Sequence, residues 1–316
     1  MKLLQHSTRQ FISEARGVKG YSLFDFIHGY IYSRFPYLYI GTGIGEHKQA
    51  KVLLSVVQFF GRILAPVNQL WKRAFPPKVE IQFADTYHGK VVPITAAKKL
   101  LTIQQEIRLE NLEHVIPYQK ARDLIMLEPT HIAVLDCPCR AARKNPCLPM
   151  DVCLIVGEPF VGMLLDYRPQ QARRITQEEA LQILEAEDAR GHVHHAFFKD
   201  AMLGRFYAIC NCCSCCCGAM QAHQQGTPML ASSGYLAEVD ADLCIGCESC
   251  MDYCQFHAIS VPEATAIIDP NACMGCGVCT SHCSQDAIHL ERNADKGIPL
   301  ELDELINSVM KPVSAS

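Results

Sequence analysis

Eight cysteines near the carboxy terminus stand in two runs with the same spacing, C-x2-C-x2-C-x3-C. The first run comprises Cys244, Cys247, Cys250 and Cys254, and the second comprises Cys273, Cys276, Cys279 and Cys283. A constant offset of 29 residues relates the runs, and it also aligns 238–247 with 267–276. Such an internal repeat predicts two copies of one folding unit, each made of a strand, a cysteine loop, a short helix and a strand.

The spacing of these cysteines is typical of iron–sulfur ligation, because soft thiolates match the iron and balance the charge of a cluster. Two-residue gaps let one tight loop place three thiolates around a cubane, and Gly246 and Gly275 relieve crowding of the backbone there. The fourth cysteine of each run is expected to ligate the other cluster. The predicted ligand sets are Cys244, Cys247, Cys250 and Cys283 for one [4Fe–4S] cluster and Cys273, Cys276, Cys279 and Cys254 for the second.

Residues 236–292 resemble the bacterial two-cluster ferredoxin family through these eight cysteines in register. The resemblance implies two [4Fe–4S] clusters, single-electron transfer and a redox partner protein that docks close to them. One departure concerns the residue after each fourth cysteine, where the family has proline and this chain has Gln255 and Ser284. Zinc bound by C-x2-C knuckles is the alternative, but the third cysteine of each run and the duplication argue against it.

Ten further cysteines lie upstream of the repeat, in the segments DCPCRAARKNPCLPMDVC and CNCCSCCC. The first segment contains Cys137, Cys139, Cys147 and Cys153, and the second contains Cys210, Cys212, Cys213, Cys215, Cys216 and Cys217. A run this dense is not ordinary core packing, because buried structural cysteines are normally isolated. It predicts a metal or redox site with ligands from both segments.

Three interpretations of this upstream site compete. A further iron–sulfur cluster comes first because an electron-transfer domain adjoins it; Pro138 and Pro146 would stiffen the first loop, and Arg140 could hydrogen-bond sulfur or neutralise the charge of the cluster. Structural zinc held by four thiolates comes second. A redox-active dithiol that exchanges electrons with a disulfide comes third.

The pattern from CPCR through a capped helix to CNCCSCCC is similar to a group of iron–sulfur proteins of anaerobes described only as 4Fe–4S dicluster ferredoxin-like. The similarity covers about residues 125–290. It implies that the two cysteine blocks occur together with the ferredoxin module and that the host is anaerobic, and it implies no substrate.

The length of 316 residues, with 49% apolar and 20% charged residues, is typical of a globular chain of two or three domains. The expected fold class is α+β, a mixed amino-terminal region followed by a ferredoxin-like domain with duplicated halves. The expected parts are an α+β domain of unknown role (1–125), a cysteine-rich region (126–235), the ferredoxin domain (236–292) and a tail (293–316). A net charge of −4 without a basic run argues against a nucleic-acid partner.

Local patterns predict secondary structure near both cysteine segments. Residues 37–40 look like a buried strand, and the alternating glycines at 41–45 look like a turn rather than a phosphate loop, because their spacing does not match GxGxxG. Residues 132–135 predict a short buried strand that leads to Cys137. A helix over 176–190 begins with the capping box TQEE and ends at a glycine.

Two further segments bear on the organisation of the chain. Residues 227–237, rich in proline, glycine and serine, predict a linker with a boundary near Leu236. The sequence HVHHAFF places His192 and His194 on one strand face, where they could bind metal. A solvated or hydrogen-bonded strand end is the favoured interpretation, because neither a carboxylate nor a cysteine lies beside them in the sequence.

The amino terminus, MKLLQHSTRQFISEARG, becomes polar too early for a signal peptide, and no twin-arginine motif is found. A cytoplasmic protein is therefore expected, in which reduced cysteines serve as metal ligands. The most apolar segment, 51–71, is interrupted by polar residues, so no transmembrane span is expected. Its helical spacing predicts a buried helix, and the alternative is an interfacial helix that contacts a membrane or a partner subunit.

Three functions fit these observations. The first is an electron-transfer protein or subunit. The second is an oxidoreductase whose catalytic centre lies in residues 1–235, where the upstream cysteines, the aromatic segment and the single histidines His28, His47 and His88 would shape a pocket. The third is a thiol or metal redox sensor. The sequence contains no nucleophile elbow, Walker loop or dinucleotide fingerprint, so no catalytic residue and no flavin or nicotinamide site is assigned.

Overall fold

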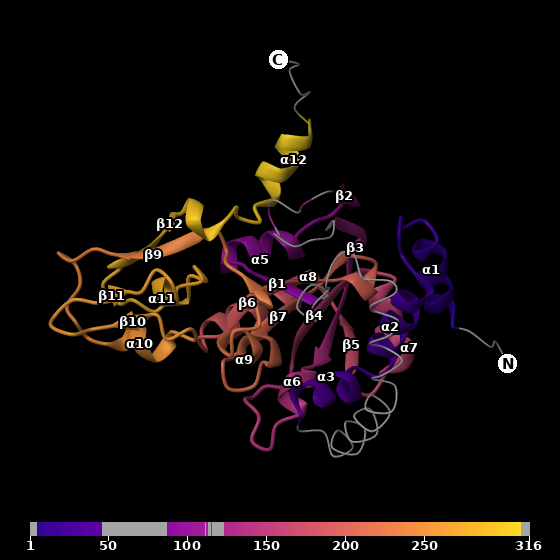
Figure 1. Ribbon diagram of the computed structural model, residues 1–316, viewed down its shortest axis with the longest axis horizontal. Coiled ribbons are helices and arrows are strands. Elements are labelled where there is room, and N and C mark those ends of the chain that lie inside the picture. The colour runs from indigo at the N-terminus through magenta and orange to yellow at the C-terminus, as the bar shows by residue number, and fades with distance from the viewer. Residues whose placement is uncertain (1–4, 46–86, 111, 113–114, 116–122, 311–316) are drawn as a thin grey trace, which may run out of the picture.

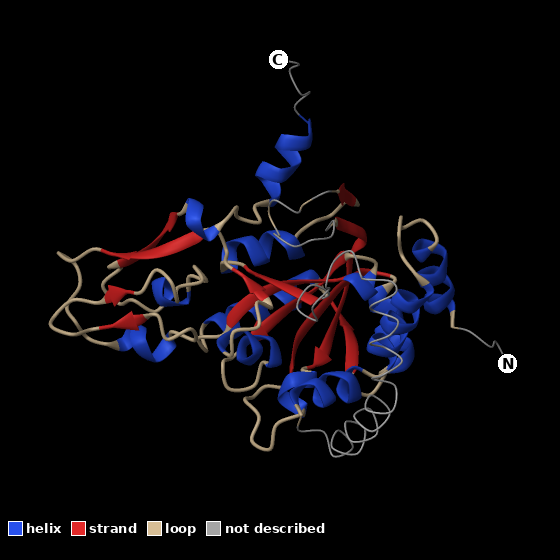
Figure 2. Ribbon diagram, in the orientation of Figure 1, coloured by secondary structure: helices blue, strands red, loops and turns tan. Residues whose placement is uncertain are grey.

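The structure is a computed structural model that describes residues 5–45, 87–110, 112, 115 and 123–310. It belongs to the α+β class: helices cover a mixed sheet, and a smaller part with short strands and helices lies to one side (Figure 1, Figure 2). The expected helix over 51–71 and the single histidine His47 lie outside the described residues. Within the described part, no helix has the length and apolar character that crossing a membrane requires.

The main sheet has eight strands in the order β2-β3-β4-β7-β6-β1-β8, with β5 paired to β3. The strands are β1 (Tyr87–Val91), β2 (Ile107–Leu109), β3 (Leu124–Asp136), β4 (Asp151–Glu158), β5 (Ala172–Ile175), β6 (Val193–Lys199), β7 (Arg205–Cys212) and β8 (Leu230–Ala231). All neighbours in the sheet are antiparallel except β1 and β8. The expected boundary at residue 125 falls inside β3, so the main sheet contains strands from both of the parts expected at 1–125 and 126–235.

Helices pack on both faces of this sheet. One face is covered by α1 (His6–Ala15), α2 (Leu23–Arg34), α3 (Pro36–Ile44), α7 (Phe160–Tyr167) and α9 (Gly218–Gln224). The other face is covered by α5 (Ile94–Leu101) and α8 (Gln177–Asp188), and α12 (Leu302–Met310) packs against α5 and β2. Short helical turns, α6 (Pro138–Ala141) and η2 (Asp200–Met202), follow β3 and β6. Two apolar cores therefore form, one on each face of the sheet.

The predicted strand at 37–40 and the predicted glycine turn at 41–45 are wrong, because α3 occupies this segment. Pro36 stands at the first position of the helix, where its missing N–H and fixed φ favour a helix start. Gly45 ends the helix in the left-handed region, with φ +84°. The aromatic residues of the segment pack against neighbouring helices, and that tertiary packing outweighs their preference for strands.

Other local predictions are confirmed. Residues 132–135 lie in β3, and α8 has Thr176 at its N-cap, where the hydroxyl accepts a hydrogen bond from the N–H of Glu179 at 3.1 Å. Gly191 follows the helix with φ +79°. The segment 227–237 is more than a linker, because β8 within it joins the main sheet and the next strand begins at Tyr235.

The carboxy-terminal part contains two small sheets. Its elements are β9 (Tyr235–Val239), α10 (Ser249–Tyr253), β10 (Ile259–Ser260), β11 (Ile267–Ile268), α11 (Val278–Ser281), β12 (Ile288–Arg292) and η3 (Ala294–Lys296). Strand β9 pairs with β12, and β10 pairs with β11, both antiparallel. Figure 1 shows these elements side by side, projecting from the edge of the main sheet.

Candidate metal centres

Two small cavities open in the carboxy-terminal part, and four cysteines line each of them. The outer cavity is lined by Cys244, Cys247, Cys250 and Cys283. The inner cavity is lined by Cys254, Cys273, Cys276 and Cys279. Each cavity thus collects three thiols from one cysteine run and the fourth thiol from the other run.

The hydrogen bonds around these cavities recur 29 residues apart. The N–H of Ala258 donates to Cys254 Sγ at 3.2 Å, and the N–H of Ala287 donates to Cys283 Sγ at 3.3 Å. The N–H of Asp240 donates to the carbonyl of Ala287, and the N–H of Asp269 donates to that of Ala258, both at 2.8 Å. Backbone N–H donors of this kind favour the charged thiolate form that iron requires.

Two glycines allow the cysteine loops to pack closely. Gly246 and Gly275 both have φ +64°, a conformation that side chains rarely tolerate. A Cβ on Gly275 would lie 2.1 Å from the carbonyl oxygen of Tyr235, and one on Gly246 would lie 2.6 Å from that of Ala264. The loops therefore need glycine at these two positions for space as well as for backbone conformation.

The two cavities differ in their exposure to solvent. Cys247 of the outer cavity is exposed, whereas no cysteine of the inner cavity is exposed. A hydrogen bond from the backbone of Ser249 lowers the pKa of Cys247, and burial raises the pKa of Cys276 to about 12. The outer loop also exposes Leu243 and Ile245. The outer cavity therefore faces solvent, and the inner cavity faces the protein.

The loop of the inner cavity is fixed to the rest of the molecule. The N–H of Ser233 donates to the carbonyl of Met274 at 3.1 Å, and its hydroxyl donates to the carbonyl of Gly275 at 2.6 Å. Met274 and Val278 are buried in the same core as Met220 of α9. This packing holds the inner cavity against the upstream cysteine region.

The main sheet brings upstream cysteines from three strands together. Cys137 follows β3, Cys153 lies in β4, and Cys210 and Cys212 lie at the end of β7. Cys153 pairs with Leu135 on one side and with Cys210 on the other. Since residues that pair directly across strands point to the same face, Cys153 and Cys210 project together beneath α7.

Eight thiols line a cavity of about 80 Å³ between the sheet and the covering helices. Two of them, Cys213 and Cys216, also belong to a closer cluster described below, and the other six are Cys137, Cys139, Cys153, Cys210, Cys212 and Cys217. Hydrogen bonds with Cys139 and Cys153 hold the pKa of Cys137 well below its ordinary range. The backbone N–H groups of Arg140 and Met220 donate to Cys137 and Cys217. We call the six thiols Cys137, Cys139, Cys153, Cys210, Cys212 and Cys217 the cavity cysteines.

The rest of the cavity wall is mainly apolar. Side chains of α2, α3 and α7 contribute Tyr32, Ile40, Phe160 and Leu164, and Met202 closes one side. Such a combination of several thiols with an apolar surround suits a cofactor or cluster that must be shielded from water.

The other four upstream cysteines lie together at the edge of this cavity, which Cys213 and Cys216 also line: Cys147, Cys213, Cys215 and Cys216. We call them the outer tetrad. Their sulfur atoms all lie within 4.8 Å of one another. Burial raises the pKa of Cys213 to about 12 and the pKa values of Cys147 and Cys215 to about 11. Cys147, Cys213 and Cys215 therefore keep their protons at neutral pH unless a cation takes the place of those protons, whereas hydrogen bonds from the backbone of Cys147 and from neighbouring thiols lower the pKa of Cys216 despite its burial.

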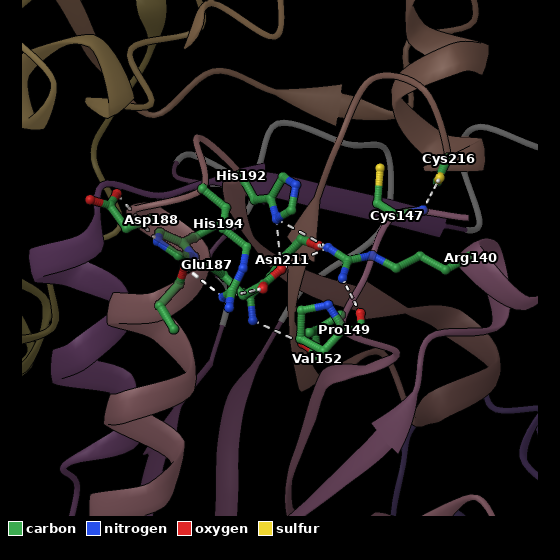
Figure 3. Close-up of polar contacts among 12 residues, drawn as sticks. Arg140, Cys147, Pro149, Val152, Glu187, Asp188, His192, His194, Asn211 and Cys216 are labelled. Carbon is green, nitrogen blue, oxygen red and sulfur yellow. Dashed lines mark hydrogen bonds and ion pairs between the residues drawn. The ribbon is translucent and has the colours of Figure 1, made fainter. Parts of the chain in front are cut away.

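Arg140 is buried, but its guanidinium binds other partners than sulfur (Figure 3). It donates to Glu187 Oε2 at 2.7 Å and to the carbonyl oxygen of Pro149, and it lies 3.1 Å from Nδ1 of His192. Burial disfavours its charge, yet the hydrogen bond and charge of Glu187 outweigh that effect and raise the pKa of Arg140. The side chain thus joins the first cysteine loop to α8, on the far face of the sheet.

The histidine-rich strand is hydrogen-bonded and buried, so of the two favoured forms of this strand end the hydrogen-bonded one is found and the solvated one is not. His192 Nδ1 lies 2.7 Å from Glu187 Oε2, and His194 Nδ1 lies 2.6 Å from Asn211 Oδ1 (Figure 3). Asn211 in turn donates to the carbonyl of Val152 at 2.8 Å. The sequence analysis missed Glu187 and Asn211; Glu187 in a capped, otherwise solvated helix gives no sign of its buried position.

The aromatic segment encloses a buried lysine. Lys199 Nζ lies 5.0 Å and 5.1 Å from the ring centres of Tyr32 and Tyr39. His28 Nε2 lies 2.6 Å from the hydroxyl of Tyr39. Burial lowers the pKa of Lys199 to about 7. His28 thus contacts the lysine site and His88 lies in β1, and neither histidine lines the cavity of the upstream cysteines.

Comparison with known proteins identifies one family. Residues 243–292 match the family model of a 4Fe-4S dicluster domain. No curated protein and no solved structure matches the chain. The carboxy-terminal part is therefore an iron–sulfur, ferredoxin-like domain, which supports a role in electron transfer.

Proposed function

We propose that this protein transfers electrons through two [4Fe–4S] clusters to a third cysteine-bound centre in the upstream cavity. One observation carries the proposal: the ferredoxin-like domain docks on the cysteine run through the residue next to a predicted cluster ligand. The N–H of Ser214, inside CNCCSCCC, donates to the side chain of Gln255 at 2.9 Å, and Gln255 follows Cys254. An iron–sulfur domain fixed at this place is positioned to deliver electrons to the neighbouring thiols.

The lining of the two small cavities supports the assignment of ligands. Cys244, Cys247, Cys250 and Cys283 would hold the outer cluster, and Cys254, Cys273, Cys276 and Cys279 the inner cluster. The N–H donors to Cys254 and Cys283 fit thiolate ligands at equivalent places in the two runs. When bound, the clusters supply one-electron carriers whose potentials follow from charge, hydrogen bonds and exposure.

The order of the centres supports a direction for the path. The exposed Cys247 and the apolar Leu243 and Ile245 make the outer cluster the place where a redox partner protein would dock. The inner cluster, packed against the main sheet, would connect this entry to the cavity. All eighteen cysteines are free thiols, which fits a reducing compartment such as the cytoplasm.

The cavity cysteines are the proposed ligands of the third centre. Their thiols come from both predicted segments, and the N–H groups of Arg140 and Met220 already donate to two of them. No three of these six come as close together as the outer tetrad does. Six thiols are more than the four ligands that one tetrahedral ion takes, and a polynuclear cluster can use ligands spread around a cavity. An iron–sulfur cluster therefore fits this cavity better than a single ion.

Iron and acid-labile sulfide measured on the full chain, purified without air, would test the proposal. About twelve iron atoms and an equal amount of sulfide per chain are expected from three cubanes. Cys139→Ser should lower both by about four, and Cys247→Ser should lower both by about four at a different centre. A colourless protein with zinc in place of iron and no reducible paramagnetic centre would contradict the electron-transfer role.

An oxidoreductase is the second candidate, and the cavity itself favours it. Its wall joins thiols to an apolar surface that includes Tyr32, Phe160 and Met202, so a small molecule could bind beside the third centre. An organic cofactor or ligand that remains bound through anaerobic purification, and that Phe160→Trp displaces without loss of iron, would favour this function.

A further inference from the structure

The outer tetrad has a spacing that differs from that of every other cysteine set in the described part of the chain. Its four sulfur atoms lie within 4.8 Å of one another, and no other group of three or more cysteines does so. Cys147 Sγ lies 3.1 Å from Cys215 Sγ, and Cys215 Sγ lies 3.7 Å from Cys216 Sγ. These distances are short for thiols that serve four separate iron atoms.

A single tetrahedral ion accounts for this spacing. With a metal–sulfur distance of about 2.3 Å, the edges of a sulfur tetrahedron measure about 3.8 Å. The separations of 3.1 Å and 3.7 Å lie below and close to that value, and all separations in the outer tetrad are at most 4.8 Å. A cubane would push the four sulfur atoms farther apart, as in the two cavities of the ferredoxin-like domain. The donor set, four thiolates, suits Zn²⁺ or a single iron ion.

The backbone around the outer tetrad is arranged as such a site requires. The N–H of Cys147 donates to Cys216 Sγ at 3.5 Å, which ties the two cysteine loops at the metal position (Figure 3). Arg143 donates to the carbonyl of Cys216 at 3.0 Å and to the side chain of Gln221. These hydrogen bonds do not require a metal ion, so they hold the two loops in place before an ion binds.

We propose that Cys147, Cys213, Cys215 and Cys216 bind one tetrahedral metal ion, at a site separate from the centre held by the cavity cysteines. The ten upstream cysteines then serve two adjoining sites, four at the outer tetrad and six in the cavity, and the buried Cys213 and Cys216 lie where the two sites meet. The ion would fasten the loop between β7 and α9 to the loop before β4. The loop between β7 and α9 is flanked by Cys212 at the end of β7 and by Cys217 at the start of α9, so the ion also positions these two thiols of the cavity.

The two sites make separable predictions about metal and sulfide. The full chain, purified without air, should carry one metal ion per chain beyond the iron that is matched by sulfide. Cys147→Ser and Cys215→Ser should each remove that one ion and leave the sulfide content unchanged. Cys139→Ser, the matched variant in the cavity, should lower iron and sulfide together and leave the extra ion in place. Zinc analysis and the signal of a ferric tetrathiolate distinguish the two metals.

X-ray absorption at the edge of the extra metal in the unmodified protein gives a reading that does not depend on folding of a variant. Four sulfur neighbours at about 2.3 Å and no metal neighbour are expected. Loss of sulfide together with iron in Cys215→Ser would overturn the proposal, since it would place a cluster at the outer tetrad. Absence of an extra ion, or its loss in Cys139→Ser, would overturn it as well. The number of clusters is tested separately, by the total iron and sulfide content, so failure of this proposal can be distinguished from failure of the proposed function.

Discussion

The side chain of Gln255 accepts a hydrogen bond from the backbone N–H of Ser214, and this contact joins the ferredoxin-like domain to the upstream cysteine run. Gln255 occupies the position where two-cluster ferredoxins carry proline. Proline has no amide oxygen in its side chain and could not accept this bond. The departure from the ferredoxin pattern therefore serves the docking of the domain within this chain.

Gln255→Pro should weaken the docking and leave both clusters of the domain in place. Cys254 has φ −77° and ψ 96°, an extended conformation that tolerates a following proline. Loss of one hydrogen bond should cost about 1 kcal/mol, so the amide of Ser214 should exchange roughly fivefold faster. Ser284→Pro, at the exposed equivalent position 29 residues later, is the matched control and should leave that exchange unchanged. The docking role would be contradicted if the amide of Ser214 exchanged at the same rate in Gln255→Pro and in Ser284→Pro.

The outer cluster should be lost before the inner cluster when the protein meets a chelator or air. Cys247 is exposed, whereas Cys273 and Cys279 are buried. The iron of the ferredoxin-like domain should therefore be released in two phases, each of about four iron atoms, and the first should be absent from Cys247→Ser. Measuring the absorbance and the released iron over time checks this order. A single phase in the unmodified protein would show that the difference in exposure has no effect.

Gly275→Ala should prevent assembly of the inner cluster. The new Cβ would lie 2.1 Å from the carbonyl oxygen of Tyr235, at a φ of +64°. We expect a loss of about four iron atoms per chain together with lowered thermal stability. Gly297→Ala is a suitable control, because Gly297 also has a positive φ but has open space around it. Similar iron loss in the two variants would mean that backbone strain, and not the close approach of Tyr235, is responsible.

Removing Glu187 should destabilise the protein strongly, because it would leave the charge of Arg140 buried without a carboxylate. Both side chains are about 1% exposed, and their ion pair measures 2.7 Å. Breaking a pair of this kind costs about 3–5 kcal/mol. Glu187→Gln and Arg140→Met should each show this loss in denaturant unfolding, and the double variant should show less than the sum. Arg190→Met, which alters an exposed partner of Glu187, should have a much smaller effect.

Lys199 should make stability depend on pH. Its pKa is lowered to about 7 from an ordinary value of 10.5, so the unfolded chain binds this proton more tightly than the folded protein does. The free energy of unfolding should therefore rise between pH 7 and pH 10.5, by at most about 1.4 kcal/mol per pH unit. Below pH 7 the cost of burying the charged lysine is fully present. Lys199→Met should be more stable than the unmodified protein at pH 7, and this difference should shrink towards pH 10.

Denaturant unfolding at several pH values, without air, measures this difference. Lys98→Met is the control, because Lys98 forms an exposed ion pair with Glu185. The predicted linkage would be contradicted by a difference between Lys199→Met and the unmodified protein that stays constant from pH 7 to pH 10.

The sequence predicts the ferredoxin-like domain well because its information is local. The spacing of the eight cysteines and the 29-residue offset limit how the loops can fold, and the family match covers the same segment. The helix over 176–190 was predictable for the same reason, since Thr176 and Gly191 mark its ends. By contrast, α3 was missed because the strand preference of Tyr37 and Tyr39 and the nearby glycines obscured the helix start at Pro36.

The division of the upstream cysteines could not be predicted, because it depends on contacts between distant segments. Cys139 and Cys147 lie in one loop, yet the first faces the cavity and the second joins the outer tetrad. The buried positions of Glu187 and Lys199 are also set by packing across the sheet. Strand alternation at Cys210 and Cys212 was the one local pattern that could have shown which thiols point inward.

The eight-residue run CNCCSCCC contacts three neighbours at once: the cavity, the outer tetrad and, through Ser214, the ferredoxin-like domain. Its length is therefore as constrained as its composition, because a one-residue insertion would move each thiol into its neighbour's place. The exposed Cys215 makes this segment vulnerable from outside. An oxidant that modifies that one thiol would remove a ligand of the outer tetrad, so damage at the surface would release the loop between β7 and α9 from the loop before β4.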